Sequence, residues 1–258
     1  MRTAIVEEPV SQAAVWSRRL AVFALAVGAV AFLIVRTQSV DIASGLAVFG
    51  SAIVLACASL ICAGAAAAII WRTGRRGLGA MLAGVALSCA FLAYPAWLAA
   101  QAMRLPVLND VTTDLVDPPQ FSLKPKALEA RGGRTPQTPP PAIRQAQRAA
   151  YPDVQAILLE LDADEAYQLV LKAVQARGWR IVDQSAPGGR LGLGHIDAID
   201  RSLVMGFPDD VTVRIKPLAG QTKIDVRSVS RYGRNDFGAN ARRIEQFAQA
   251  VQDQLDAR

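Results

Sequence analysis

The sequence predicts an α+β protein in which three N-terminal transmembrane helices precede a small domain of element order α-β-β-β-β-α, with an antiparallel sheet covered by helices. Three observations lead to this fold class. Long apolar runs fill the first 100 residues, a proline-rich stretch follows, and the remaining residues alternate or repeat as strands and helices do. We therefore expect three parts: a transmembrane anchor over 1–101, an extended connector over 102–150 and an α+β domain over 151–258.

The apolar runs cover residues 20–35, 42–70 and 77–100. A helix that crosses a bilayer needs about 20 residues, so the second and third runs are long enough. The first run is shorter, but Arg19 and Arg36 flank it, and their long side chains can extend to the membrane interfaces. The sequence therefore predicts three spans.

The charge distribution supports a membrane anchor. The chain has a net charge of +6, and residues 1–100 hold 7 Lys+Arg against 3 Asp+Glu, whereas residues 101–258 hold 21 against 19. Because the excess positive charge lies beside the apolar runs, membrane topology explains it and we predict no nucleic-acid partner. No cofactor motif is present either.

Arginines also predict the orientation. They precede the first run and fill the loop between the second and third runs: Arg2, Arg18, Arg19, Arg72, Arg75 and Arg76. By the positive-inside rule the N-terminus and this loop are cytoplasmic, so the C-terminal domain is periplasmic in a bacterial inner membrane. The "SRRLAV" segment resembles a twin-arginine signal, but no small-residue cleavage site follows, and we interpret the first run as a retained anchor.

Small residues are spaced for close helix packing in the second span. Ala52 and Ala56, and likewise Gly64 and Ala68, are four apart, which favours contact within the bundle or between copies of a homo-oligomer. All three cysteines lie in predicted spans and are interpreted as small packing residues: Cys57, Cys62 and Cys89. The exported part therefore has neither a disulfide nor a thiol nucleophile.

The connector holds nine of the fourteen prolines between residues 102 and 152, which predicts extended, partly polyproline II backbone. Within it, Asp110, Asp114 and Asp117 could supply oxygen ligands to a hard cation. The spacing of a calcium-binding loop is missing, however. Turns stabilised by Asp and Thr side chains explain the same residues, and we assign no metal site.

The C-terminal domain begins near Tyr151. Helical spacing follows Asp162 and ends at Gly178, and alternating strands are expected over 179–186, 190–199, 209–218 and 222–230. A last helix is predicted by the apolar repeat that ends the chain, with Ile244 and Phe247 among its members. Sequential strands joined by short turns predict an antiparallel meander.

Four segments resemble a known bacterial family: "LNDVTTDLVDPPQF", "QRAAYPDV", "GFPDDVTVRI" and "DVRSVSRYGRNDFGANARRI". In this order they resemble domain of unknown function 1499, over roughly residues 105–255. Members of the family are often attached to the membrane by N-terminal helices. The resemblance implies no reaction, cofactor or catalytic residue.

The last of these segments contains the candidate site. Asp236 or Asn235 could cap the final helix, and Arg231 and Arg234 could pair with Asp236 or with Asp209 and Asp210 on a neighbouring strand. We favour this structural interpretation. The alternative is an anion site at the helix N-terminus, for phosphate, carboxylate or a lipid headgroup. Its residues would be Arg227, Arg231, Arg234, Asn235 and Gly238.

Catalytic groups are sparse. His195 is the single histidine, and Asp197 lies two residues on, so both could share a strand face with Ser202 or Ser230 as a third member. No G-x-S-x-G motif marks a nucleophile. Asp209 and Asp210 are adjacent and would point to opposite strand faces, which is unsuited to shared acid–base work.

These observations favour a non-catalytic periplasmic binding or scaffolding domain that acts in cell-envelope organisation, with envelope proteins or anionic lipid as partners. The alternative is a periplasm-facing hydrolase or lipid-modifying enzyme.

Overall fold

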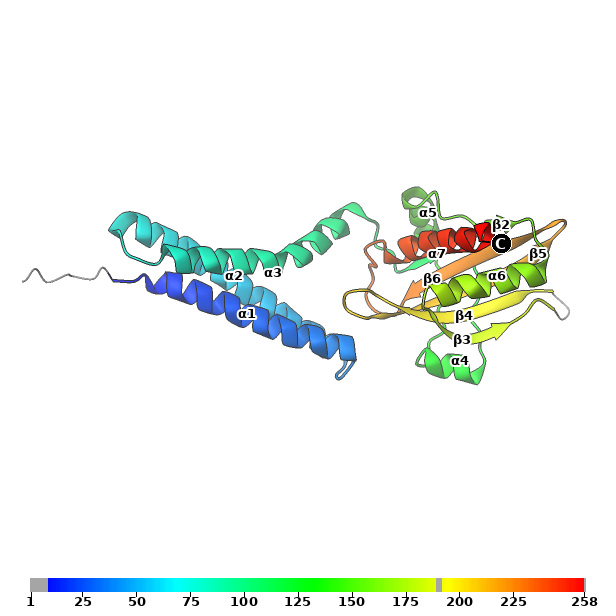
Figure 1. Ribbon diagram of the computed structural model, residues 1–258, viewed down its shortest axis with the longest axis horizontal. Coiled ribbons are helices and arrows are strands. Elements are labelled where there is room, and N and C mark those ends of the chain that lie inside the picture. Colours follow the sequence, from blue (N-terminus) through cyan, green and yellow to red (C-terminus); the bar gives the residue numbers. More distant parts are fainter. Residues whose placement is uncertain (1–8, 189–191, 258) are drawn as a thin grey trace, which may run out of the picture. The chain divides into compact units, whose positions relative to one another are not determined.

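The computed structural model describes residues 9–188 and 192–257, and the chain divides into two compact units, one of helices and one built around a sheet (Figure 1). Arg2 and part of the turn predicted at 187–189 lie outside the described residues. Each unit is described in turn.

The first unit contains the three helices that the apolar runs predict. They are α1 (Gln12–Thr37), α2 (Ile42–Thr73) and α3 (Leu78–Arg104), and all are long and apolar enough to cross a membrane. Each is longer than its apolar run because polar residues continue the helix at one or both ends. Ser11 and Asp41 cap the first two, accepting hydrogen bonds from the backbone N–H groups of Ala14 and Ser44.

A buried cluster of serines joins the three helices. Ser59 of α2 donates to the backbone carbonyl of Ser17 in α1 at 2.8 Å, and Ser88 of α3 donates to the Ser59 hydroxyl at 2.9 Å. Close approach is possible because Gly84 faces Ser17: a Cβ at this position would lie 2.1 Å from the Ser17 hydroxyl oxygen. Small residues and hydroxyl hydrogen bonds therefore hold the bundle, as is common between membrane helices.

The predicted packing residues of α2 separate into two groups. Ala52 and Ala56 are fully buried, whereas Gly64 and Ala68 are exposed. Cys57 and Cys89 are exposed and Cys62 is half-buried, so the cysteines do not fill the interior of the bundle as expected.

The second unit is built on a six-stranded antiparallel sheet of order β1-β6-β5-β4-β3, with β2 also paired to β6. The strands are β1 (Asp110–Thr112), β2 (Ile157–Leu159), β3 (Arg180–Ser185), β4 (Gly194–Arg201), β5 (Pro208–Leu218) and β6 (Gln221–Ser230). The predicted meander of four strands is present as β3 to β6, and the α+β class is confirmed.

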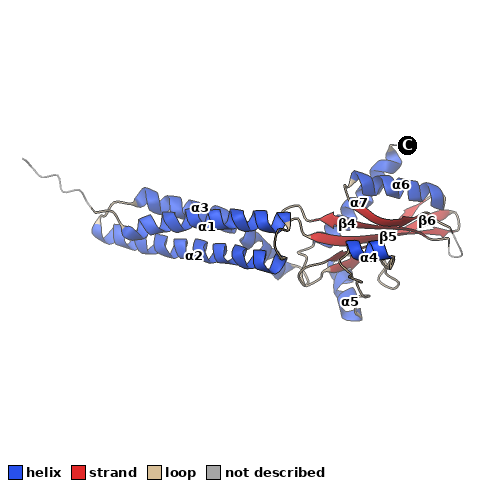
Figure 2. Ribbon diagram, turned by 90° about the horizontal axis from the view of Figure 1, so that it is seen from below, coloured by secondary structure: helices blue, strands red, loops and turns tan. Residues whose placement is uncertain are grey.

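One face of the sheet is apolar and packs against α6 (Ala163–Ala176) and α7 (Ala239–Asp256). Figure 2 shows these two helices together on one side of the strands. Strand alternation directs Val211, Val213 and Ile215 toward them. Trp179 stacks on Phe247 of α7 with ring centroids 5.1 Å apart, so the helices and the sheet share one core.

Residues 102–150 differ from the extended connector that their prolines predict. They contain β1, α4 (Pro125–Ala130) and α5 (Pro141–Ala150), and each helix has proline in its first turn. Proline is well tolerated there because the first N–H groups of a helix have no intrahelical acceptor. The two extra strands, β1 and β2, have three residues each, which is too short to show an alternating pattern.

We predict that Phe247→Ala lowers the free energy of unfolding of the domain by about 3–5 kcal/mol, because it removes a fully buried ring from the core. Urea unfolding of the full chain in detergent measures this through Trp179 fluorescence, with the tryptophans of the helical unit replaced by phenylalanine. Gln249→Ala, on the exposed side of α7, is the control and should change the value by about 0.5 kcal/mol or less. Equal effects of the two variants would contradict this account of the core.

Candidate functional site on the polar face of the sheet

The sheet face opposite α6 and α7 carries polar side chains, and we call it the polar face. Strand pairing places one row of residues directly opposite one another across five strands: Thr112, Arg227, Thr212, Asp197 and Asp183. The adjacent row consists of Asp225, Arg214, His195 and Ser185. Opposed residues share a face, so charged groups from distant parts of the sequence meet here.

The segment that follows β1 covers this face and neutralises its charges. Arg227 is fully buried and donates two hydrogen bonds to the Asp110 carboxylate, at 3.0 and 2.7 Å. Its remaining bonds go to the backbone carbonyls of Pro119 and Gln137, and its guanidinium lies 5.6 Å from the Phe121 ring centroid. Burial raises the pKa of Asp110, and the paired arginine offsets part of that rise.

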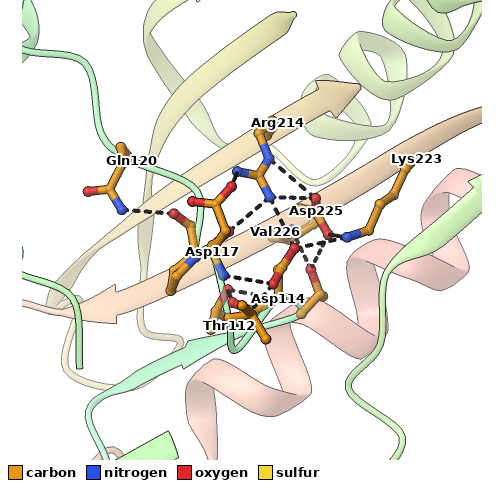
Figure 3. A network of polar contacts seen from close by, with 11 residues as sticks. Thr112, Asp114, Asp117, Gln120, Arg214, Lys223, Asp225 and Val226 are labelled. Carbon is orange, nitrogen blue, oxygen red and sulfur yellow. Dashed lines mark hydrogen bonds and ion pairs between the residues drawn. The ribbon is translucent and has the colours of Figure 1, made fainter. Parts of the chain in front are cut away.

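A second group of charges lies further along the same face (Figure 3). Arg214 of β5 donates to Asp225 at 2.8 Å, to Asp114 at 3.2 Å and to Asp117 at 2.7 Å. Lys223 of β6 contacts the carboxylates of Asp114, at 2.9 Å, and Asp225, at 3.1 Å. Two cations and three carboxylates therefore form one network that ties the covering segment to β5 and β6.

Within this network, the pKa values of Asp114 and Lys223 shift toward the charged forms. Burial raises the pKa of Asp114, but hydrogen bonds from the backbone of Asp117 and from Lys223 outweigh it and the pKa falls below its ordinary value. Burial lowers the pKa of Lys223, but hydrogen bonds to Asp114 and Asp225 outweigh it and the pKa rises. At neutral pH the ion pairs are therefore favoured.

These contacts account for the three aspartates considered as cation ligands. Asp114 and Asp117 bind Arg214, and Asp110 binds Arg227. Within residues 9–188 and 192–257, no group of three or more His, Cys, Asp or Glu side chains is arranged to hold a metal ion. Protein cations neutralise these carboxylates.

Asp209 and Asp210 point to opposite faces of β5, as strand alternation requires. Asp210 accepts from Arg231 at 2.7 Å on the polar face. On the helix face, Asp209 accepts from Arg243 of α7 at 2.5 Å. Burial raises the pKa of both carboxyls, and their arginines offset part of the rise. Burial lowers the pKa of Arg243, but Asp209 and Asp200 together outweigh it and the pKa rises.

The residues considered for anion binding do not gather around one open position. Arg227 is buried on Asp110, and Arg231 donates to Asp210 and to the backbone carbonyl of Ala130. At the start of α7, Asp236 accepts hydrogen bonds from the backbone N–H groups of Gly238, at 2.8 Å, and Asn240, at 2.9 Å. A carboxylate therefore already occupies the electropositive helix end.

The remaining candidates are Arg234, which is exposed, and Asn235, whose side chain accepts from the backbone N–H of Phe237. This bond shapes the turn before α7. Gly238 adopts a positive φ of 75° in that turn, which glycine accommodates without strain.

One position on the polar face keeps buried polar atoms without hydrogen bonds. His195 Nε2 lies 3.1 Å from Asp197 Oδ1, an ion-pair distance, but among the described residues neither atom has a hydrogen-bond partner. Asp183 Oδ2, on the neighbouring strand, also lacks one. The other Asp197 oxygen accepts from Arg131 at 2.9 Å and from the backbone N–H of Ser122 at 2.8 Å.

The serines proposed as the third member of this His195 cluster are engaged elsewhere. The Ser202 hydroxyl accepts from the backbone N–H of Phe207, and the Ser230 hydroxyl accepts from the Asn240 side chain. Burial raises the pKa of Asp183, but hydrogen bonds from Ser122 and Lys124 outweigh it and the pKa falls below its ordinary value. The cluster thus holds an anionic carboxylate close to the imidazole.

Sequence reasoning missed three of the buried arginines: Arg131, Arg214 and Arg243. Arg214 alternates with valine and isoleucine in β5, as an exposed residue would, and the prolines of its covering segment predict an extended connector. The sequence nonetheless contains one indication of these ion pairs: aspartates and arginines recur together on both sides of the proline-rich stretch.

A comparison with known families matches residues 110–251 to a family described as "Protein of unknown function (DUF1499)". The match begins at β1 and therefore includes the covering segment with the sheet. No curated protein matches the chain.

We predict that Arg227→Met lowers the free energy of unfolding by about 3–5 kcal/mol, because it leaves the Asp110 carboxylate buried without its partner. The double variant Arg227→Met/Asp110→Leu should recover most of this loss. Lys124→Ala is the matched control: its pair with Asp183 is exposed on the lysine side and should contribute about 1 kcal/mol or less. If the single and double variants were equally unstable, the pair would not be coupled.

We further predict that Asp114→Asn changes how stability depends on pH. The folded pKa of Asp114 is lowered, so its contribution is present above the unfolded pKa of about 3.9 and is lost as the pH falls through the lower folded pKa. The stability difference between wild type and Asp114→Asn, measured by urea unfolding, should therefore be constant near neutral pH and shrink below about pH 4. A difference that grows with acidity would show the opposite sign of coupling.

Proposed function

The chain belongs to the DUF1499 family of proteins of unknown function, and we propose that it is an integral bacterial inner-membrane protein. It presents a non-catalytic binding or scaffolding domain to the periplasm and acts in cell-envelope organisation. Three helices of suitable length and hydropathy precede the domain. Its partners are the bilayer, envelope proteins and anionic lipid, and exposed small residues of α2, such as Gly64, favour self-association in the membrane.

The observation that carries the proposal is the internal use of charge. The arginines and aspartates of the polar face bind one another beneath the segment that follows β1, instead of pointing into a common open site. Side chains held in such pairs stabilise one arrangement of the sheet and its cover. This architecture suits a domain that offers a fixed outer surface to partners.

The placement of the domain rests on arginine asymmetry. Arg72, Arg75 and Arg76 lie at the junction of α2 and α3, and Arg18 and Arg19 lie near the start of α1. The loop between α1 and α2 contains no arginine or lysine beyond the end of α1. The positive-inside rule supports a cytoplasmic position for the first two regions and a periplasmic domain.

A second candidate function is a periplasm-facing hydrolase centred on the His195 cluster. The observation that favours it is a set of buried atoms on His195, Asp197 and Asp183 that have no hydrogen-bond partner among the described residues. Such groups resemble a general base with its orienting carboxylate. A nucleophile or an activated water would still have to be supplied next to the imidazole.

For the topology, we predict that alkaline phosphatase fused after the last residue is active and that green fluorescent protein fused there is dark, since each reports one side of the membrane. Fusions inserted after Gly74, in the arginine-rich loop, are the control and should give the reverse pattern. Fluorescence from the C-terminal fusion with an inactive phosphatase would overturn the periplasmic placement.

For the chemistry, we predict that the purified full chain hydrolyses chromogenic carboxylic and phosphoric esters no faster than its His195→Gln variant. Gln replaces the imidazole with a neutral side chain, and thermal unfolding of the two proteins checks that the fold is kept. Hydrolysis by wild type that the folded variant lacks would favour the enzyme over the binding domain.

A further inference from the structure

One end of the sheet collects three segments, and we call it the loop end. The β4–β5 loop (202–207) and the β6–α7 loop (231–238) both lie there, because Arg201 pairs with Pro208 and Asp209 with Ser230. The chain also enters the domain here. Ser230 N–H donates to the Asn109 carbonyl, and Asp236 N–H donates to the Leu108 carbonyl, each at 2.8 Å.

The loop end exposes large apolar side chains. Leu203 is 90% exposed and Tyr232 is 43% exposed, and the Tyr232 ring lies 6.2 Å from that of Phe207. Residues 203–207 read Leu-Val-Met-Gly-Phe, an apolar sequence for a hairpin tip. Met103, at 83% exposure, lies in the last turn of α3, just before the entry point. Concentrated apolar exposure of this kind marks an interaction surface.

The accessible charges beside these residues are positive. Arg134 and Arg234 are exposed, and the Arg134 guanidinium lies 5.9 Å from the Tyr232 ring centroid. The aspartates nearby are engaged within the domain: Asp209 and Asp210 are buried on arginines, half-buried Asp200 binds Arg243, and Asp236 caps α7. Apolar side chains flanked by arginines are suited to the interface of a membrane that contains anionic lipids.

Chain connectivity keeps the loop end within reach of a bilayer. The apolar run of α3 ends at residue 100, and the four helical residues to Arg104 rise about 6 Å. Leu108 is already buried in the domain, so residues 105–107 form the link and span about 11 Å at most. The link is further held by Leu105, whose Cδ1 lies 3.1 Å from where a Cβ on Gly238 would stand.

We propose that the loop end is a lipid-docking surface: Leu203 and Tyr232 insert into the bilayer interface, while Arg134 and Arg234 bind anionic headgroups. The inference deepens the proposed function and rests on its membrane anchor, since it requires that α3 spans the bilayer. It is independent of which side of the membrane the domain occupies. Docking fixes the domain against the membrane and leaves the opposite end of the sheet free for other partners.

The test uses the full chain in phosphatidylcholine nanodiscs with and without phosphatidylglycerol. The native cysteines Cys57, Cys62 and Cys89 are replaced by alanine, and an environment-sensitive NBD label is attached at Leu203→Cys. We expect blue-shifted emission that is lost when the lipid acyl chains are brominated. Arg134→Gln and Arg234→Gln should each lower the ratio of inserted to water-exposed label about fivefold in anionic discs, which corresponds to about 1 kcal/mol per arginine.

The matched control is the same label at Leu158→Cys. Leu158 is 56% exposed and lies in β2, whose partners Thr222 to Ile224 are at the other end of β6. We expect a water-like spectrum there that bromination does not change. A water-like spectrum at position 203 would overturn the proposal. So would blue-shifted emission insensitive to brominated lipid, because the loop would then be docked on protein.

Failure of this test is distinguishable from failure of the membrane anchor. A second protein keeps Leu203 and Cys57 and has alanine at positions 62 and 89; its label at Cys57, which lies in α2 and is exposed, reports the anchor in the same discs. Quenching at Cys57 without quenching at position 203 rejects lipid docking alone, whereas loss of both rejects the anchor and with it the docking.

Discussion

The sheet of this domain has charged residues on the face that its two long helices leave uncovered. The segments that cover this face must provide partners for these charges. Arg227 is fully buried there, and Arg214 and Arg231 are mostly buried. A buried guanidinium is stable only when carboxylates and carbonyls satisfy its donors. Asp110 of β1 and Asp114 and Asp117 of the segment that follows provide these groups, so this segment belongs to the fold and does not act as a spacer.

This arrangement also limits what the domain can do chemically. Aspartates that could act as acids, bases or metal ligands accept hydrogen bonds from arginine and lysine, and the helix end that could bind an anion is capped by Asp236. The unpaired atoms around His195 form the exception within the part of the chain that the structure describes. The accessible features lie instead at the loop end, where arginines and apolar side chains meet the start of the domain.

Periodicity predicted much of the fold. Uncharged runs located all three apolar helices, and alternation located β3 to β6, because these signals depend on local pattern alone. The sequence also allowed two contacts to be predicted, because the residues lie beside turns. These are Asp236 at the start of α7 and the pair of Asp210 with Arg231. By contrast, α4 and α5 start at prolines, and the three-residue strands β1 and β2 form only because β6 offers them an edge. The pairing of Arg227 with Asp110, 117 residues apart in the sequence, depends on that same edge and has no local signal.

The central claim is that the segment after β1 is a structural part of the domain, held by buried ion pairs. Amide hydrogen exchange of the full chain in nanodiscs tests it most directly. The account predicts that the amides of Thr112, Thr113 and Ser122, which donate to Gln147, to the Val226 carbonyl and to Asp197, exchange as slowly as the central amides of β5 and β6. Exchange of these three amides at the rate of an unstructured peptide, while β5 and β6 remain protected, would contradict it.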